Sequence, residues 1–247
     1  MTGSGPPAPV RDISFTSGMH RISARFHPAA PPARGAAIVA HPHPAHGGDM
    51  EHPVVVTAAE RTARIGLGTL RFDFRGVGHS EGNRRDFEGH LDDWRQAVRE
   101  VRLRIPDGPL LGAGFSYGAR SLAWLLHPKR PMRPRLDALL LLGPATRVPT
   151  SRRDFGNLLL GRPLSEATLD EHVLENLRSL TGPVEVIVGD RDVVAPHEEL
   201  AANLPEHAVL QVLPGLNHFF SRTTGAGALD EDTFTAAVDQ ALARLVP

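Results

Sequence analysis

Short runs of consecutive apolar residues alternate with longer segments of helical period along most of the chain. This alternation is typical of a mostly parallel sheet flanked by helices. Unbroken apolar runs predict strands that are buried on both faces, and the run 69–74 fits least well because it carries Arg71 and Asp73. The predicted strands span residues 36–40, 69–74, 110–115, 136–142, 184–188 and 209–213.

Other periodicities surround these strands. Residues 12–16 and 21–26 alternate polar and apolar side chains, which predicts an antiparallel hairpin at one edge of the sheet. Between His90 and Ile105, apolar residues recur every three or four positions, so this segment predicts an amphipathic helix. Further helices are predicted over residues 52–65, 117–127, 197–203 and 231–245.

No composition shift marks a boundary between domains. We therefore expect a Pro- and Ala-rich disordered tail over residues 1–9 and a single domain over residues 10–247. The stretch 144–182 is longer than a simple crossover needs and contains a basic turn and an amphipathic piece. It is a candidate small lid over a site at the strand ends.

The amino-acid composition excludes several classes of function. The 247 residues include 27 basic and 28 acidic side chains, and this near-neutral balance argues against binding of nucleic acid. The absence of cysteine excludes a thiol nucleophile, disulfides and thiolate zinc sites. No apolar run approaches the roughly 18 residues of a membrane span, and the first residues do not resemble a signal peptide. We expect a cytoplasmic protein that uses serine, histidine and carboxylate side chains.

The pattern G-x-S-x-G occurs twice, around Ser80 and around Ser116. A nucleophile elbow needs a strand that turns sharply into a helix, with small residues two positions before and after the serine. Ser116 follows a predicted strand and precedes a predicted helix, whereas a polar loop follows Ser80. We therefore predict that Ser116 is a nucleophile and that Ser80 is a loop residue.

A serine hydroxyl needs a base to take its proton and a carboxylate to orient that base. His218 follows the last predicted strand and is the best placed of the 13 histidines. Asp190 and Asp192 both follow the strand 184–188 and compete for the third role. We favour Asp192, because the longer spacing carries its carboxylate past the strand end. The resulting order Ser, Asp, His is the one this class of fold uses.

The same chemistry needs hydrogen-bond donors for the developing oxyanion. One predicted donor is the backbone N–H of Tyr117, directly after the nucleophile. The second is predicted in the loop that follows residue 40, where prolines limit the early N–H donors to His41 and His43. We favour the N–H of His43. This mechanism requires no cofactor and no metal ion.

Five sequence blocks jointly resemble the α/β-hydrolase superfamily, in particular its small bacterial serine hydrolases with a minimal lid. In chain order they are HPHPAHGGDM, LRFDFRGVGHSEG, GFSYGA, GDRDVVAP and GLNHFF. The resemblance implies the α/β-hydrolase fold with a short lid insertion, and it places Ser116, Asp192 and His218 in a catalytic triad. Arg120 and His46 depart from the family pattern, and either could reshape the substrate pocket.

Three other interpretations remain open at this point. His41, His43 and His46, followed by Asp49, Glu51 and His52, have the density of a metal cluster. The glycines after residue 74 suggest a dinucleotide-binding loop, but the spacing of the third glycine does not fit the fingerprint. A hydrolase fold can also bind a ligand without catalysis.

The favoured interpretation is a serine hydrolase that cleaves an ester or a related acyl bond of a small molecule through an acyl-enzyme. The same three residues could serve an acyl transferase, a cyclase or a thioesterase. The sequence makes no prediction of oligomeric state.

Overall fold

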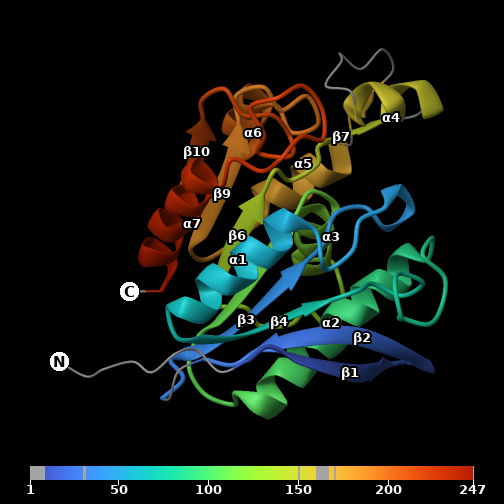
Figure 1. The fold of residues 1–247 in the computed structure, drawn as a ribbon, viewed down its shortest axis with the longest axis vertical. Helices are drawn as coiled ribbons and strands as arrows, with labels where there is room; N and C mark the ends of the chain where they lie inside the picture. Colours follow the sequence, from blue (N-terminus) through green and yellow to red (C-terminus); the bar gives the residue numbers. More distant parts are fainter. Residues whose placement is uncertain (1–8, 30–31, 150, 160–166, 170, 247) are drawn as a thin grey trace.

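A sheet of eight strands runs through the molecule in the order β1-β2-β4-β3-β5-β6-β9-β10 (Figure 1). Neighbouring strands from β4 to β10 are parallel, and β2 runs antiparallel to both β1 and β4. The computed structural model describes residues 9–29, 32–149, 151–159, 167–169 and 171–246. The sheet strands are β1 (Arg11–Ser17), β2 (His20–His27), β3 (Gly35–Ala40), β4 (Leu67–Phe72), β5 (Leu110–Phe115), β6 (Ala138–Leu142), β9 (Val184–Gly189) and β10 (Ala208–Leu213).

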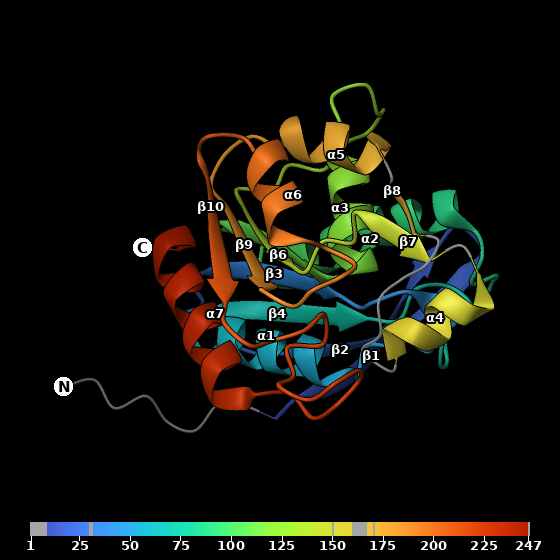
Figure 2. The same ribbon diagram turned by 90° about the horizontal axis from the view of Figure 1, so that it is seen from above.

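Helices cover both faces of this sheet (Figure 2). Helices α1 and α7 contribute to one apolar core, and α2, α3, α5 and α6 contribute to the core on the opposite face. The helices are α1 (Pro53–Arg64), α2 (Phe87–Arg104), α3 (Tyr117–Leu126), α4 (Arg152–Leu159), α5 (Glu171–Arg178), α6 (His197–Asn203) and α7 (Glu231–Leu245). A short 3₁₀ helix, Pro44–His46, follows β3, and β7 (Arg147–Pro149) pairs with β8 (Ala167–Leu169) in a separate antiparallel ribbon. In the described part of the chain, no helix has the length and apolar character that crossing a membrane requires.

The predicted fold class is confirmed, and the predicted hairpin forms β1 and β2 at one edge of the sheet. The predicted strand 69–74 is displaced, because β4 begins at Leu67 and ends at Phe72. Arg71 within it is only 3% exposed. Its guanidinium donates hydrogen bonds to the ring of His27 and to the carbonyl of Met50, and it pairs with Glu51. These partners explain how a charged residue occupies a buried strand.

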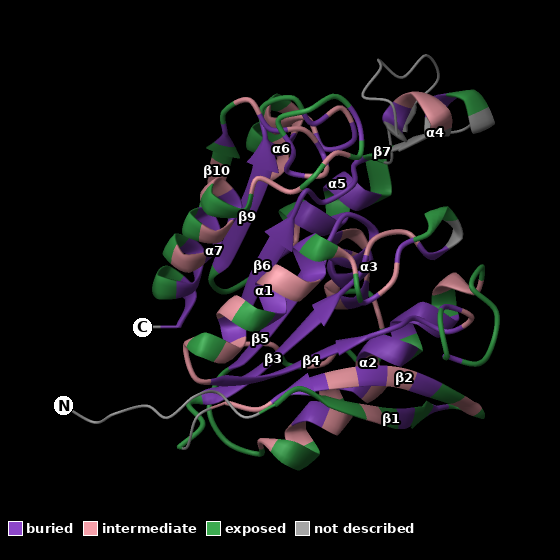
Figure 3. Ribbon diagram, in the orientation of Figure 1, coloured by how far each residue is buried: buried purple, intermediate pink, exposed green. Residues whose placement is uncertain are grey.

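The prediction that the last strand is buried on both faces is wrong. Central strands are buried throughout, but β10 is the final strand of the sheet and has only β9 beside it (Figure 3). Val209 and Val212 are therefore 41% and 37% exposed. The predicted tail lies outside the described residues, except for residue 9.

Candidate active site

Ser116 lies at the sharp turn between β5 and α3. Its φ angle of 53° is in the left-handed region, where residues other than glycine are strained. The two flanking glycines let the turn close: a Cβ on Gly114 would lie 2.4 Å from the carbonyl carbon of Gly118, and one on Gly118 would lie 2.5 Å from the carbonyl oxygen of Ala40. The turn therefore has the geometry of a nucleophile elbow.

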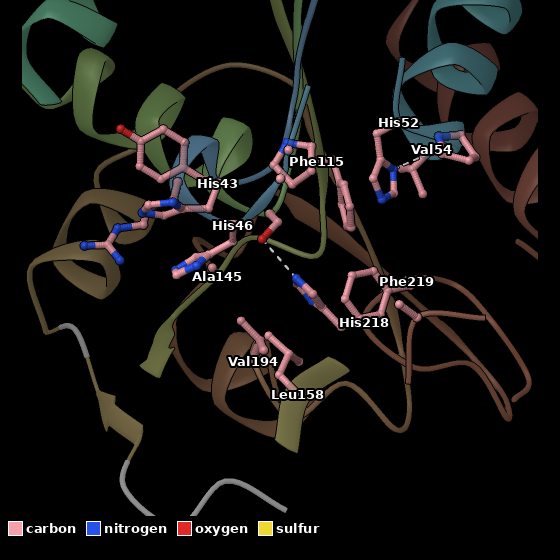
Figure 4. Close-up of a pocket in the computed structure, with 18 of the residues that line it drawn as sticks. His43, His46, His52, Val54, Phe115, Ala145, Leu158, Val194, His218 and Phe219 are labelled. Carbon is pink, nitrogen blue, oxygen red and sulfur yellow. Dashed lines mark hydrogen bonds between the residues drawn. The ribbon is translucent and has the colours of Figure 1, made fainter. Parts of the chain in front are cut away.

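The side chains of Ser116, His218 and Asp192 form a continuous hydrogen-bonded chain. His218 Nε2 lies 2.9 Å from Ser116 Oγ (Figure 4), and His218 Nδ1 lies 2.8 Å from Asp192 Oδ2. A carboxylate can only accept, so Nδ1 carries the proton and Nε2 is left to accept from the serine hydroxyl. All three residues are less than 8% exposed. The structure thus brings together the three residues that the sequence predicted as a triad.

The loop after β10 is organised by the side chain of Asn217, directly before His218. Its amide makes hydrogen bonds through both of its polar atoms. Oδ1 accepts from two backbone N–H groups of the loop, and Nδ2 donates to two carbonyls further along. These partners are Phe219 and Ser221, then Thr223 and Gly225. The position of the His218 backbone therefore depends on a fully bonded amide.

Asp190, the competing candidate, lies apart from this chain. Its Oδ1 accepts a hydrogen bond from the backbone N–H of Gly215 at 2.7 Å. This bond joins the ends of β9 and β10. Asp190 is exposed, whereas Asp192 is 4% exposed.

The loop after β3 brings His43 to the pocket beside Tyr117, with 4.8 Å between their ring centroids. Tyr117 is the first residue of α3, so its N–H belongs to the helical turn that has no intrahelical acceptor. His41 anchors the start of the loop: its Nε2 accepts from the N–H of Phe74, and its Nδ1 lies 2.6 Å from the carbonyl oxygen of Pro42. Both residues predicted as oxyanion donors therefore line the same pocket as Ser116.

Burial keeps His41 and His43 neutral. It lowers the pKa of His41 to about 3, and burial, with smaller contributions from nearby His46 and Arg120, lowers the pKa of His43 to about 3. Both ring nitrogens of His41 are engaged with the backbone. Among the described residues, no three His, Asp or Glu side chains are grouped so that they could hold a metal ion. The metal cluster suggested by the sequence does not match this arrangement.

The second G-x-S-x-G pattern has a structural role. Ser80 Oγ donates to the carbonyl of Asp73 and accepts from the N–H of Ser23, both at 2.8 Å. The glycine-rich loop around it closes on itself through a bond from the N–H of Gly76 to the carbonyl of Glu81. Ser80 therefore connects the end of β4 to β2, and the glycines whose spacing does not fit a dinucleotide fingerprint form the loop around it.

A pocket of about 350 Å³ opens over Ser116, and its lining is mostly apolar. His43 and His46 lie on one side of it, and His52 and Phe219 lie on the other (Figure 4). Leu158 of α4 also lines it. The sequence named His52 only as a neighbour of the histidine cluster. The sequence signal that could have identified His52 as a helix cap is Pro53, because proline is favoured at the first position of a helix.

Comparison with known proteins agrees with this fold. A sequence model described as an alpha/beta hydrolase domain matches residues 34–245. Because the match covers most of the chain, the protein belongs to the α/β-hydrolase family. Its structure is similar to XC6422 of Xanthomonas campestris, an α/β serine hydrolase without lid, with a TM-score of 0.68 and 25% identity over 98% of this chain and 99% of that one.

Two relatives are similar in sequence. Protein RP471 of Rickettsia prowazekii is 26% identical over 221 residues, which are 86% of this chain and 83% of that protein. The mitochondrial palmitoyl-protein thioesterase ABHD10 of Homo sapiens is 34% identical over 94 residues. That match spans 38% of this chain and only 28% of the human protein.

Proposed function

We propose that the protein is a serine hydrolase in which Ser116 is the nucleophile, His218 the general base and Asp192 the carboxylate that orients the base. The observation that carries this proposal is the hydrogen-bonded chain from Ser116 Oγ through His218 to Asp192, with distances of 2.9 and 2.8 Å. A serine hydroxyl becomes an effective nucleophile only in such an arrangement. Membership of a family that contains serine hydrolases supports the proposal.

In this mechanism Ser116 Oγ attacks the carbonyl carbon while its proton passes to His218 Nε2. The imidazolium is stabilised by Asp192 and then returns the proton to the leaving atom. The backbone N–H groups of Tyr117 and His43 donate to the oxyanion. In the second step His218 takes a proton from water, whose oxygen attacks the acyl carbon, and the same donors stabilise the second tetrahedral state. The bond from the acyl carbon to Ser116 Oγ then breaks, and His218 returns the proton to Ser116 Oγ.

The proposed substrate is a small molecule with an ester or a related acyl bond. The mostly apolar pocket of about 350 Å³ suits an uncharged acyl ester. A thioester is the second candidate, because one relative is a palmitoyl-protein thioesterase that matches 38% of this chain. The two substrates would react through the same three residues and differ in the leaving atom.

Residues 10–247 are proposed to form one domain in which the segment 144–182 includes a small lid. Helix α4 lies at the periphery of the molecule in two perpendicular views (Figures 1 and 2). Its Leu158 packs with Ala145 and Val194 beside the pocket. By contrast, α5 packs into the main core through Val173 and Leu177, so α4 is the part of this segment that borders the pocket.

Labelling of the purified protein by a fluorophosphonate tests the nucleophile. Wild type and Ser80→Ala are expected to be labelled and to hydrolyse a panel of acyl esters and thioesters. Ser116→Ala is expected to lose labelling and to lose kcat by about a million-fold, as in other serine hydrolases. Full turnover by Ser116→Ala together with no labelling of wild type would overturn the proposal. No labelling of wild type, together with no turnover of any substrate, would support a ligand-binding role instead.

A further inference from the structure

His52 caps the N-terminus of α1 through its ring. Its Nδ1 accepts a hydrogen bond from the backbone N–H of Val54 at 3.3 Å. A backbone N–H can only donate, so Nδ1 carries no proton in this arrangement. The neutral ring therefore holds its proton on Nε2, and this nitrogen is a hydrogen-bond donor.

The donor on Nε2 belongs to the pocket that holds Ser116. The ring of His52 lines this pocket, and its bond to Val54 leaves the opposite edge of the ring facing the cavity (Figure 4). Nε2 has no hydrogen-bond partner among the residues that the structure describes. Burial, with a smaller contribution from nearby His218, lowers the pKa of His52 to about 4. At neutral pH the pocket thus contains an uncharged donor in mostly apolar surroundings.

His52 lies on the side of the pocket that contains His218. The ring of Phe115 contacts both, with centroid distances of 5.0 Å to His52 and 5.3 Å to His218. Phe219 also packs against His218 and stacks with His52. The predicted oxyanion donor His43 lies on the other side (Figure 4).

The two sides of the pocket would therefore contact different parts of a substrate, the leaving group on one side and the oxyanion on the other. In acyl transfer the base returns its proton to the leaving atom, so the leaving group must lie next to the imidazole of His218. The oxyanion points away from it, toward the backbone donors. The surface formed by His52, Phe115 and Phe219 is therefore the surface that a leaving group would contact.

We propose that His52 is a specificity-determining residue that donates a hydrogen bond from Nε2 to an uncharged oxygen in the leaving group. The preferred leaving group is an uncharged alcohol or thiol in which an ether, carbonyl or hydroxyl oxygen follows a short apolar segment. The apolar segment packs against Phe115 and Phe219, and the oxygen reaches His52. This inference rests on the proposed hydrolase function and deepens it.

Matched esters test the inference. Methoxyethyl and n-butyl esters of one acyl group differ only in the replacement of an ether oxygen by a methylene, and methoxypropyl and n-pentyl esters form a second, longer pair. The measured quantity is the ratio of kcat/KM for the ether ester to that for its hydrocarbon partner. In His52→Ser this ratio is expected to fall about three- to tenfold relative to wild type for at least one pair, which is the effect of one neutral hydrogen bond. Serine retains a capping oxygen for α1 but is too short to reach the leaving group.

Two further variants separate the hydrogen bond from ring packing. His52→Phe keeps a flat ring in the pocket and removes the donor, so it is expected to lower the ratio as His52→Ser does. His79→Phe changes an exposed histidine in the loop after β4 and is expected to leave the ratio at the wild-type value. A ratio that stays within twofold of wild type in both His52 variants, while the esters are hydrolysed, would overturn the inference and leave the proposed function intact. Failure of wild type to hydrolyse any ester or thioester, together with no reaction with a fluorophosphonate, would overturn both.

Discussion

The carboxylate of Asp192 divides its two oxygens between His218 and the backbone. Oδ2 lies 2.8 Å from His218 Nδ1, and Oδ1 accepts from the N–H groups of Val194 and Ala195, each at 2.8 Å. The two backbone donors determine how the carboxyl group is turned. Its orientation thus comes from the chain segment directly after it, and the orientation of His218 comes from Asp192.

Because each oxygen of Asp192 has its own partner, the effect of Asp192→Asn on catalysis can be predicted. The amide oxygen would face the two backbone donors, because they require an acceptor, and the NH₂ group would face His218 Nδ1. Nδ1 would then have to accept, which moves the ring proton to Nε2 and prevents it from taking the proton of Ser116. We expect kcat to fall by about 10⁴ with little change in KM, as judged from a chymotrypsin-type triad with the same substitution.

Steady-state kinetics and far-UV circular dichroism of Asp192→Asn check this expectation together. A folded variant with kcat within tenfold of wild type would show that Asp192 does not control the tautomer of His218. Asp190→Asn is the matched comparison, because its carboxylate bonds to the Gly215 N–H and not to the histidine. It is expected to retain most of the activity.

The close approach of β3 to the elbow predicts the effect of Gly118→Ala. The added Cβ would lie 2.5 Å from the carbonyl oxygen of Ala40, and backbone on either side must shift to relieve it. We expect a loss of about 1–3 kcal/mol in the free energy of unfolding, typical of overpacking, and a lower rate of fluorophosphonate labelling. Urea denaturation and labelling kinetics measure the two effects.

Gly156→Ala is the control for this substitution. Gly156 lies inside α4, and a Cβ there would meet no atom of the described residues within 4 Å. Alanine favours a helix more than glycine does, so this variant is expected to be unchanged or stabilised by up to about 1 kcal/mol. Equal stability of the two variants would contradict the packing described for the elbow.

Acid is expected to destabilise the protein through its buried neutral histidines. The pKa of His41 falls from the ordinary histidine value of 6.5 to about 3 in the folded state, mainly through burial. Below about pH 6.5 the unfolded chain binds a proton at this position and the folded protein does not, so the stability that is present above this pH is lost as the pH falls toward 3. The expected slope from this residue is about 1.4 kcal/mol per pH unit.

Urea denaturation at several pH values between 7 and 5 measures this slope. His41→Gln retains an acceptor for the N–H of Phe74 but does not titrate, so its stability is expected to fall less steeply than that of wild type. His79→Phe, which changes an exposed histidine, is expected to follow the wild-type curve. Parallel curves for wild type and His41→Gln would contradict the assignment.

Most of the fold could be predicted from local patterns. The boundaries of β5, α6 and α7 match the predicted ranges, because strand and helix periods are strong there. The exposure of β10 was not predictable, since an apolar run has the same appearance in a central strand and in an edge strand. The burial of Arg71 likewise depends on partners from β2 and from the loop before α1.

The residue types of the proposed site, and their order, followed from the sequence by itself, because the elbow glycines and the loops after each strand are local features. Only the tertiary structure decided which of them meet. Ser116 and His218 are 102 positions apart, and their contact depends on which strands lie side by side in the sheet. The tertiary structure also decided the tautomer of His52 and its position beside His218. Both depend on hydrogen bonds and packing that the pattern of apolar and polar residues does not encode.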